Sequence, residues 1–308
     1  MRIAYFGTPT DAVAPLHAVV AAGHDVVLVV TQPDRRRGRG GDTTPSPVKG
    51  AAIDLGIPVR TPVRAGELVD ELVGLDLEAG VVVAFGQLLP PSVLATARHG
   101  FVNLHFSLLP RWRGAAPVER AVLAGDADTG VCVMAIDEGM DTGGVFASVS
   151  TPIAPHDTAG ELAARLVALG TPLLVEVLAD LPARAAVPQT GEPTHAPKLT
   201  VDEFRLDWAR PATELARRVM AGNPRPGAWT TLDDRRLKVL RARAEPDPDP
   251  HPDPAPAGTP PGTVDADGCV ATGAGRLRLV EVQPEGKAAM TAAAWLAGRQ
   301  GAPARLTS

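Results

Sequence analysis

Short apolar runs, each about the length of one strand, alternate with helix-forming stretches in the first part of the chain. Residues 2–7, 25–31 and 79–85 are rich in Val, Ala, Leu and Phe, and residues 10–22 between the first two runs are rich in Ala and Val. Strands that are apolar on both faces are typical of a parallel sheet covered by helices on both sides. This alternation therefore predicts an α/β fold with a doubly wound, mostly parallel sheet.

A capping box marks the start of a long helical region near the middle of the chain. Thr158 is followed three residues later by Glu161, and such a pair satisfies the first main-chain N–H groups of a helix. We expect a helix from this point to about Leu169, and more helix to about Leu181. Before it we expect strands at residues 101–105, 131–136 and 145–151, the last two joined around residues 139–144.

The character of the sequence changes after residues 182–197, which carry four prolines and show little periodicity. We interpret them as part of a linker. The expected domains are a catalytic domain at 1–184, a linker at 185–204 and a β-domain at 205–308. The short strands and turns of the last domain predict a small open barrel of the oligonucleotide-binding kind. A helix is expected at 212–221 and strands at 228–232, 236–243, 263–266, 269–272 and 276–282.

Composition narrows the class of protein. Apolar residues make up 45% of the 308 residues, which is enough for two ordinary cores. Only Cys132 and Cys269 could provide thiols, so we expect no disulfide framework and no cysteine metal site. No apolar run reaches the roughly 20 residues that span a bilayer, and the chain begins directly with a strand instead of a signal peptide. We therefore expect a cytoplasmic protein.

Charge is uneven along the chain. The net charge is −5, but residues 35–39 read Arg-Arg-Arg-Gly-Arg and residues 245–253 alternate proline with acidic residues. Residues 245–262, which alternate proline with acidic residues or alanine, have the composition of a solvated loop without a core, and we assign them no function. A basic loop is usually a solvated charge run as well. However, the loop at 33–49 follows a strand of the predicted sheet, and a cationic loop beside an active site suits a polyanionic substrate.

Three side chains form the candidate catalytic group. Asn103 and His105 are two residues apart at the end of a predicted strand, so their side chains point to the same side. An amide can stabilise a developing oxyanion, and an imidazole can exchange a proton near neutral pH. Asp141 lies in a glycine-rich turn that can direct its carboxylate to the same edge of the sheet, where open α/β sheets bind their ligands.

Two neighbouring segments bear on the kind of ligand. Arg111 and Arg113 flank Trp112 where Pro110 and Gly114 interrupt regular structure, and such a set can hold an anionic or aromatic ligand. The turn at residues 7–9 follows the first strand, but it lacks the G-x-G-x-x-G pattern of dinucleotide-binding loops. The turn therefore argues against a nicotinamide-dependent oxidoreductase.

The segment from Asn103 to Pro117 resembles the active-site signature of methionyl-tRNA formyltransferases. Matching motifs occur in the family's order along nearly the whole chain. They lie at residues 6–9, 31–35, 45–49, 83–86, 137–143 and 286–290. Two positions depart from the family pattern. Phe106 stands where many members have a smaller residue, and Arg225 stands where an aromatic residue is expected.

The resemblance implies a metal-independent enzyme that transfers a formyl group from 10-formyltetrahydrofolate to the α-amino group of methionyl-initiator tRNA, for translation initiation. It implies a catalytic role for Asn103, His105 and Asp141. Which of His105 and Asp141 moves which proton stays open. The expected folate contacts are Phe85, Gly86, Gln87, Leu88, Ser107, Leu108, Leu109, Pro110, Asp137 and Gly139. The expected RNA contacts are Arg37, Arg39, Lys49, Arg111 and Arg113, and the expected oligomeric state is a monomer without membrane contact.

Other functions remain open from the residues alone. A formyl-folate-dependent hydrolase or a sugar-nucleotide formyltransferase would use the same three side chains with water or a sugar amine as the acceptor. A non-catalytic RNA-binding protein is a different class, and the complete set of Asn103, His105 and Asp141 argues against it. The basic loop and the predicted β-domain favour tRNA as the acceptor.

Overall fold

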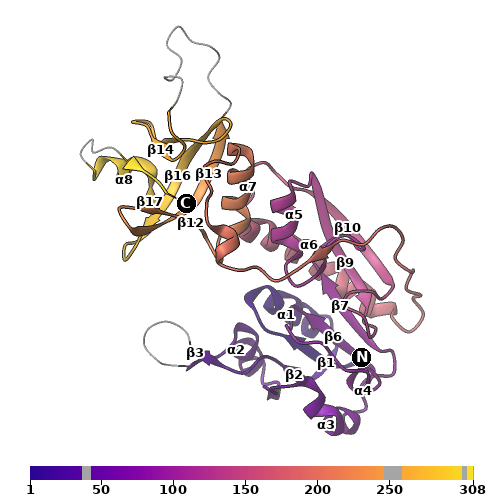
Figure 1. The fold of residues 1–308 in the computed structure, drawn as a ribbon. Coiled ribbons are helices and arrows are strands. Elements are labelled where there is room, and N and C mark those ends of the chain that lie inside the picture. Colours follow the sequence, from indigo (N-terminus) through magenta and orange to yellow (C-terminus); the bar gives the residue numbers. More distant parts are fainter. Residues whose placement is uncertain (37–42, 246–258, 300–303, 308) are drawn as a thin grey trace. The chain divides into compact units, whose positions relative to one another are not determined.

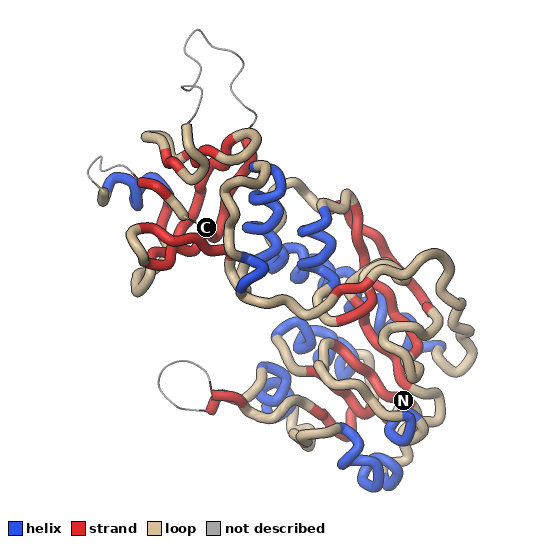
Figure 2. The backbone as a smooth tube through the Cα atoms, in the orientation of Figure 1, coloured by secondary structure: helices blue, strands red, loops and turns tan. Residues whose placement is uncertain are grey.

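The computed structural model describes residues 1–36, 43–245, 259–299 and 304–307, and divides into two compact units. The first consists of Met1–Pro117, Asp128–Pro152 and Ala163–Pro197. The second consists of Val118–Ala127, Ile153–Leu162 and Lys198–Ser308. Each unit is built around one main sheet (Figures 1 and 2). The domain boundaries expected at residues 184 and 204 stay a prediction, although residues 185–197 belong to the first unit.

The first unit contains the predicted mostly parallel sheet. Its strand order is β10-β9-β7-β6-β1-β2-β5, and all neighbours run parallel except β10 with β9 and β9 with β7. The chain passes from β1 to β2 on one side and later to β6 on the other, so the sheet has a switch point between β1 and β6. The strands are β1 (Arg2–Gly7), β2 (Asp25–Val30), β5 (Val59–Arg60), β6 (Ala79–Val83), β7 (Phe101–His105), β9 (Asp128–Ala135) and β10 (Val145–Pro152).

Both faces of this sheet are covered, which explains why its strands are apolar throughout. On one face, Phe6 packs edge-on against Phe85 and Phe101, with ring centroids 5.4 and 5.6 Å away. Leu72 of α3 and Val93 of α4 belong to the same buried cluster. The helical elements near the carboxyl ends of the parallel strands are short. They are η1 (Thr10–Ala12), α1 (Val13–Ala21), α2 (Pro47–Asp54), η2 (Ala65–Leu68), α3 (Val69–Gly74) and α4 (Pro91–Leu94).

On the other face, the Tyr5 hydroxyl donates to the carbonyl of Ala12 at 2.6 Å, which ties β1 to the turn before α1. The long helix α6 (Ala159–Asp180) lies against the sheet, because a Cβ at Gly170 would meet the side chains of Val131 and Leu104. The glycine at this position allows the helix and the strands to approach closely.

Helix α6 is one continuous helix, whereas the sequence suggested a helix to about Leu169 followed by more helix. The capping box is confirmed, since Glu161 N donates to the Thr158 hydroxyl at 3.1 Å and Thr158 N donates to the Glu161 carboxylate at 3.0 Å. Among the helices of the described residues, α6 alone is long and apolar enough to cross a membrane by length and composition. Buried leucines along its length, among them Leu166 and Leu174, account for that composition as the packing of a core helix.

The second unit holds the predicted antiparallel β-domain. Its strand order is β12-β13-β16-β15-β14-β18, with β17 paired to β16. Thr231 and Thr307 exchange main-chain hydrogen bonds of 3.0 and 2.9 Å, so the curled sheet nearly closes on itself. Helix α7 (Ala212–Gly222) packs on β13. The strands are β12 (Ala228–Leu232), β13 (Arg235–Glu245), β14 (Thr263–Val264), β15 (Cys269–Ala271), β16 (Arg276–Pro284), β17 (Met290–Thr291) and β18 (Ala304–Arg305).

Several short elements were not predicted. The pairing of β8 (Arg113–Gly114) with β11 (His195–Ala196) joins the signature segment to the stretch that the sequence suggested was a linker. A two-residue strand is too short to give a periodic pattern, so sequence reasoning could not detect it. Other elements that were not predicted are β3 (Arg35–Arg36), β4 (Thr43–Thr44), α5 (Pro117–Ala124), η3 (Asp202–Phe204) and α8 (Ala292–Ala297), together with α2, β5, η2, α3, α4, β17 and β18.

Candidate active site

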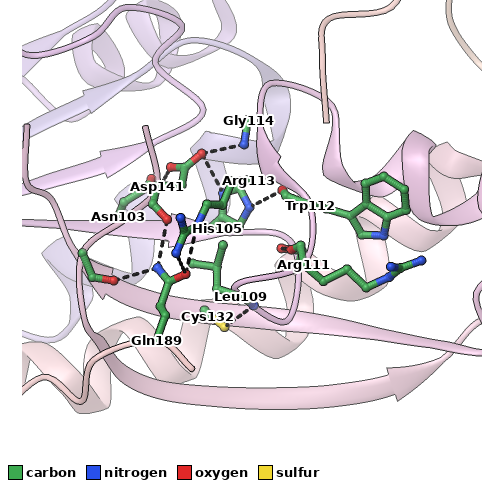
Figure 3. Close-up of polar contacts among 12 residues, drawn as sticks. Asn103, His105, Leu109, Arg111, Trp112, Arg113, Gly114, Cys132, Asp141 and Gln189 are labelled. Carbon is green, nitrogen blue, oxygen red and sulfur yellow. Dashed lines mark hydrogen bonds and ion pairs between the residues drawn. The ribbon is translucent and has the colours of Figure 1, made fainter. Parts of the chain in front are cut away.

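Asn103, His105 and Asp141 meet at the carboxyl end of β7 (Figure 3). The Asn103 amide nitrogen lies 3.4 Å from Asp141 Oδ1, and His105 Nδ1 lies 3.7 Å from Asp141 Oδ2. Asn103 and His105 share one side of the strand, as their spacing predicted, and the turn after β9 supplies Asp141. The structure thus brings the three predicted side chains together; their catalytic role is not tested by this geometry.

The imidazole of His105 has a defined orientation. Its Nε2 lies 3.0 Å from the main-chain oxygen of Trp112. A carbonyl oxygen only accepts hydrogen bonds, so Nε2 carries the proton in neutral His105 and Nδ1 is left to accept one. Nδ1 faces Asp141, and the ring is 5% exposed. The proton that His105 can gain or lose therefore sits on the side of the carboxylate.

The carboxylate of Asp141 is held by the main chain as well as by side chains. The main-chain N–H of Gly114 donates to Oδ2 at 2.8 Å. Asp141 itself has a φ of 54°, in the left-handed region that few residues other than glycine adopt. The following glycine, Gly143, packs so closely that a Cβ there would lie 1.9 Å from the carbonyl oxygen of Ala135. The tight turn that the glycines predicted therefore directs the Asp141 carboxylate to the sheet edge.

A cavity of about 380 Å³ opens beside these three side chains. Its lining includes the apolar side chains of Leu104, Met134 and Ile136. Of the expected folate contacts, Phe85, Gly86, Gln87, Leu88 and Gly139 line it. Further lining residues, which were not among the folate contacts expected by name, are Val82, Ala84, Leu89, Phe106, Gly114, Ala115, Pro117 and Met140.

One rim of the cavity is a turn of main chain after β6. Ala84 and Gly86 both have positive φ, 47° and 84°, so the turn is sharp. The Phe85 carbonyl within it accepts hydrogen bonds from the Thr8 hydroxyl at 3.0 Å and the Gln32 amide at 3.2 Å. An apolar wall beside a rim of main-chain polar groups suits a flat ring with hydrogen-bonding edges.

The other expected folate contacts do not belong to the described lining of the cavity. The Ser107 hydroxyl donates to the Arg111 carbonyl at 2.6 Å, and Leu109 N donates to Cys132 Sγ at 3.4 Å. The Asp137 carboxylate accepts from Gly139 N and the Thr142 hydroxyl. These groups shape the loops beside the cavity. Contact of Ser107, Leu108, Leu109, Pro110 and Asp137 with a ligand stays a prediction.

The residues expected to contact RNA have different environments. Arg37 and Arg39 lie outside the described residues. Lys49 forms an ion pair with Asp34, with Nζ 2.6 Å from Oδ2. Arg111 stacks its guanidinium 4.5 Å from the centre of the Trp112 ring, and Arg113 donates two hydrogen bonds to the Gln189 side chain. The role of all five in RNA binding stays a prediction.

Cys132 lies directly under this site on β9. Burial raises the pKa of its thiol, and the hydrogen bond from Leu109 N opposes that shift. A buried thiol of raised pKa is a poor nucleophile. No group of three or more His, Cys, Asp or Glu side chains in the described residues could hold a metal ion, and metal independence stays a prediction.

Comparisons with known proteins agree with this fold. Residues 1–178 match the family model described as formyl transferase, and residues 198–300 match the model of the formyl transferase C-terminal domain. The chain is 47% identical over 308 residues to the methionyl-tRNA formyltransferase of Thiobacillus denitrificans, and 44% identical over 307 residues to that of Paenarthrobacter aurescens. Each comparison covers 97% of this chain and 97% of the relative.

Two solved structures share the fold at low sequence identity. HypX from Aquifex aeolicus superposes with a TM-score of 0.67 at 18% identity, covering 98% of this chain; the chain spans 48% of that protein's length. An N-formyltransferase from Helicobacter canadensis, solved with folinic acid and dTDP-3-aminofucose, superposes with a TM-score of 0.67 at 16% identity, covering 92% of this chain and 98% of the other. The extent of the sequence identity with the curated relatives shows that this chain belongs to the methionyl-tRNA formyltransferase family.

Proposed function

We propose that this protein transfers the formyl group of 10-formyltetrahydrofolate to the α-amino group of methionine esterified to initiator tRNA. The observation that carries the proposal is the meeting of Asn103, His105 and Asp141 at the mouth of a cavity that suits a flat, polar-edged ring. Relatives that match over 97% of this chain are named for this activity, which supports tRNA as the acceptor.

The cavity fits the donor by size and chemistry. A volume of about 380 Å³ lies within the range of small-molecule sites. The apolar side chains of Leu104 and Ile136 would contact the faces of a pterin ring, while the main chain around Phe85 would bind its polar edge. This arrangement would leave the formyl group beside Asn103 and His105.

Asn103, His105 and Asp141, called the trio below, each have a chemical task in acyl transfer. The neutral amine of the methionyl ester attacks the formyl carbon, and a negative charge develops on the formyl oxygen. Asn103 would donate its amide N–H to that oxygen. A new bond to the amine nitrogen forms, and the bond to the folate nitrogen breaks. The attacking amine must lose a proton, and the departing folate nitrogen must gain one.

His105 and Asp141 would carry those protons as a pair. Nδ1 of His105 faces the Asp141 carboxylate at 3.7 Å from Oδ2, so the two groups lie where a proton could pass between them. Protonated His105 would stabilise the oxyanion or donate a proton to the folate nitrogen. Asp141 would accept a proton from the amine, directly or through water. Both oxygens of Asp141 already have N–H donors within 3.4 Å, which fixes the carboxylate for this role.

In the alternative functions, water or a sugar amine would be the acceptor. The N-formyltransferase from Helicobacter canadensis, solved with dTDP-3-aminofucose, shares this fold. A single assay distinguishes the candidates. The protein is incubated with radiolabelled 10-formyltetrahydrofolate and, separately, charged initiator tRNA, charged elongator methionine tRNA, a sugar-nucleotide amine, or water alone. We expect label in the initiator tRNA. Label only in formate, or only in the sugar, would replace the proposal with one of the alternatives.

The named relatives are bacterial proteins. A cytoplasmic location and a monomeric state remain part of the proposal, and sedimentation of the purified protein tests the second.

A further inference from the structure

We propose that Gln189 and Thr194 are positioning residues of the active site, and that the segment 187–196 is a strap that fixes both His105 and Asp141. The sequence suggested a linker at these residues. In the structure the strap runs beside the trio and contacts the two segments that orient it. The proposal rests on the proposed function, because the expected effect is on formyl transfer.

Gln189 fixes the backbone that carries Asp141. Its side-chain nitrogen donates to the carbonyl oxygens of Asp141 at 2.9 Å and Gly143 at 2.8 Å (Figure 3). Its side-chain oxygen accepts two hydrogen bonds from Arg113, of 3.0 Å from Nε and 2.7 Å from a terminal nitrogen. All polar groups of the amide are therefore engaged. The two hydrogens of the amide match two carbonyl oxygens, an arrangement that a carboxylate could not reproduce.

Thr194 fixes the backbone that holds His105. Its hydroxyl accepts from the main-chain N–H of Trp112 at 2.9 Å, and its carbonyl accepts from Arg113 N at 2.9 Å. The carbonyl of the same Trp112 accepts from His105 Nε2. The orientation of the imidazole thus depends, through the main chain of Trp112, on a hydroxyl of the strap.

Both residues that the strap holds have an unfavourable backbone conformation. Asp141 has a φ of 54° and Trp112 a φ of 62°. Residues other than glycine persist in this region when surrounding contacts over-determine it, and such positions are concentrated at functional sites. Further pairing anchors the strap on either side, between Val187 and Val145 and between Ala196 and the segment Gly114–Ala116. The strap therefore supplies the contacts that keep both catalytic side chains in place.

Full-chain variants test the proposal. Gln189→Glu keeps the size and the acceptor for Arg113 but turns an oxygen toward the carbonyls of Asp141 and Gly143. Gln189→Met removes all four hydrogen bonds at similar volume. We expect kcat for charged initiator tRNA to fall at least about tenfold in both, as a misplaced catalytic group predicts. The KM for the formyl donor should change less than about threefold, because the side chain is not part of the described cavity wall.

Two substitutions of Thr194 form a matched pair of variants. Thr194→Val removes the acceptor at constant shape, while Thr194→Ser retains it and should recover most of the rate lost in Thr194→Val. Thr171→Val is the control in the same unit, since among the described residues the Thr171 hydroxyl donates to the Val167 carbonyl of its own helix, α6. We expect Thr171→Val to match wild type in kcat. Equal kcat in Thr194→Val and Thr194→Ser, or a common loss of kcat, donor affinity and thermal stability in the strap variants, would overturn the positioning role.

Hydrogen exchange gives a measurement that does not depend on activity. In wild type the Gly114 amide is bonded to Asp141 Oδ2. Gln189→Met should speed exchange in peptides covering residues 110–116 and 137–145, with the remainder of the first unit unchanged. If the wild-type protein transfers no formyl group to any acceptor, the proposed function is refuted. Faster exchange in these peptides of Gln189→Met would still support the positioning role. Unchanged exchange together with unchanged kcat would refute the strap.

Discussion

The main-chain nitrogen of Gly114 lies 2.8 Å from Asp141 Oδ2 and donates a hydrogen bond to it. Gly114 has a φ of 123°, and a Cβ there would lie 2.8 Å from the carbonyl oxygen of Ala196. Any other residue would strain the backbone and push against the strap. The position of the Asp141 carboxylate therefore depends on a glycine 27 residues away in sequence.

Gly114→Ala should lower both stability and activity. Strain at such a position costs about 1–3 kcal/mol, and displacement of the amide would leave Asp141 Oδ2 without its main-chain donor. Gly50→Ala is the control, since Gly50 lies within α2 and nothing lies within 4 Å of a Cβ there. That change should stabilise the protein by roughly 0.5–1 kcal/mol. Urea denaturation and single-turnover transfer measure both effects; Gly114→Ala with wild-type stability would show that the backbone tolerates the side chain.

Asp141→Asn tests the trio most directly. It preserves the shape of the side chain and an oxygen for the Gly114 amide, and removes the charge that faces His105 Nδ1. We expect formyl transfer to fall at least about a hundredfold, the scale of general acid–base and oxyanion effects. Donor binding, measured by calorimetry, should change much less. Near-wild-type single-turnover rates in Asp141→Asn, His105→Ala and Asn103→Ala would refute the assignment.

The sequence predicted the fold from the pattern of its strands. The apolar runs of β1, β2 and β6 and the start of α6 at its capping box are properties of continuous segments, so periodicity and composition detect them. The trio was predicted because Asn103 and His105 share a strand face. Asp141 required the further inference that a glycine-rich turn would return to the same edge.

The strap could not be predicted because its contacts are not local. Gln189 and Thr194 lie among prolines and polar residues without periodicity, the composition of a linker. Their partners, Asp141 and Trp112, are 48 and 82 residues away. The ion pair between Lys49 and Asp34 could not be predicted either, because it forms only in the folded chain. The family resemblance had implied that Lys49 contacts RNA, and that role stays a prediction.

The capping box of α6 predicts a pH dependence in the second unit. A hydrogen bond from Arg241, with further donors on Thr158, lowers the pKa of Glu161 from 4.5 to about 2. A lowered carboxyl pKa stabilises the folded state above the unfolded pKa, and this stabilisation is lost as pH falls from about 4.5 toward 2. The carboxylate is half exposed, so solvent screening reduces the effect to about 1 kcal/mol.

Glu161→Gln should therefore be less stable than wild type at pH 7, and the difference should shrink as the pH is lowered through 4 toward 2. Urea unfolding of both proteins between pH 2.5 and 7 measures this. A difference that is constant over the whole range would mean that the carboxylate charge contributes nothing beyond the hydrogen bonds of a neutral amide.

Arg37 and Arg39 are expected to bind phosphates of the tRNA. Replacing both with alanine should weaken tRNA binding and flatten the slope of log K against log salt by about one unit per lost contact, at most about two. The defect should ease at low salt. Thermal stability should be nearly unchanged, because we expect charges in a segment of this glycine-rich composition to contribute little to folding. If the plots of log K against log salt coincide for wild type and variant, RNA is bound elsewhere.

Lys49 should behave differently from these two arginines. Its Nζ lies 2.6 Å from Asp34 Oδ2, and both side chains are about three-quarters buried. The other Asp34 oxygen is buried without a hydrogen-bond partner among the described residues. Lys49→Met would leave that carboxylate unpaired, so we expect a loss of about 1 kcal/mol in stability. Asp34→Asn combined with Lys49→Met removes both charges and should recover most of the loss. If Lys49→Met matches wild type in urea unfolding but flattens the salt slope for tRNA, Lys49 contacts RNA and not Asp34 in solution.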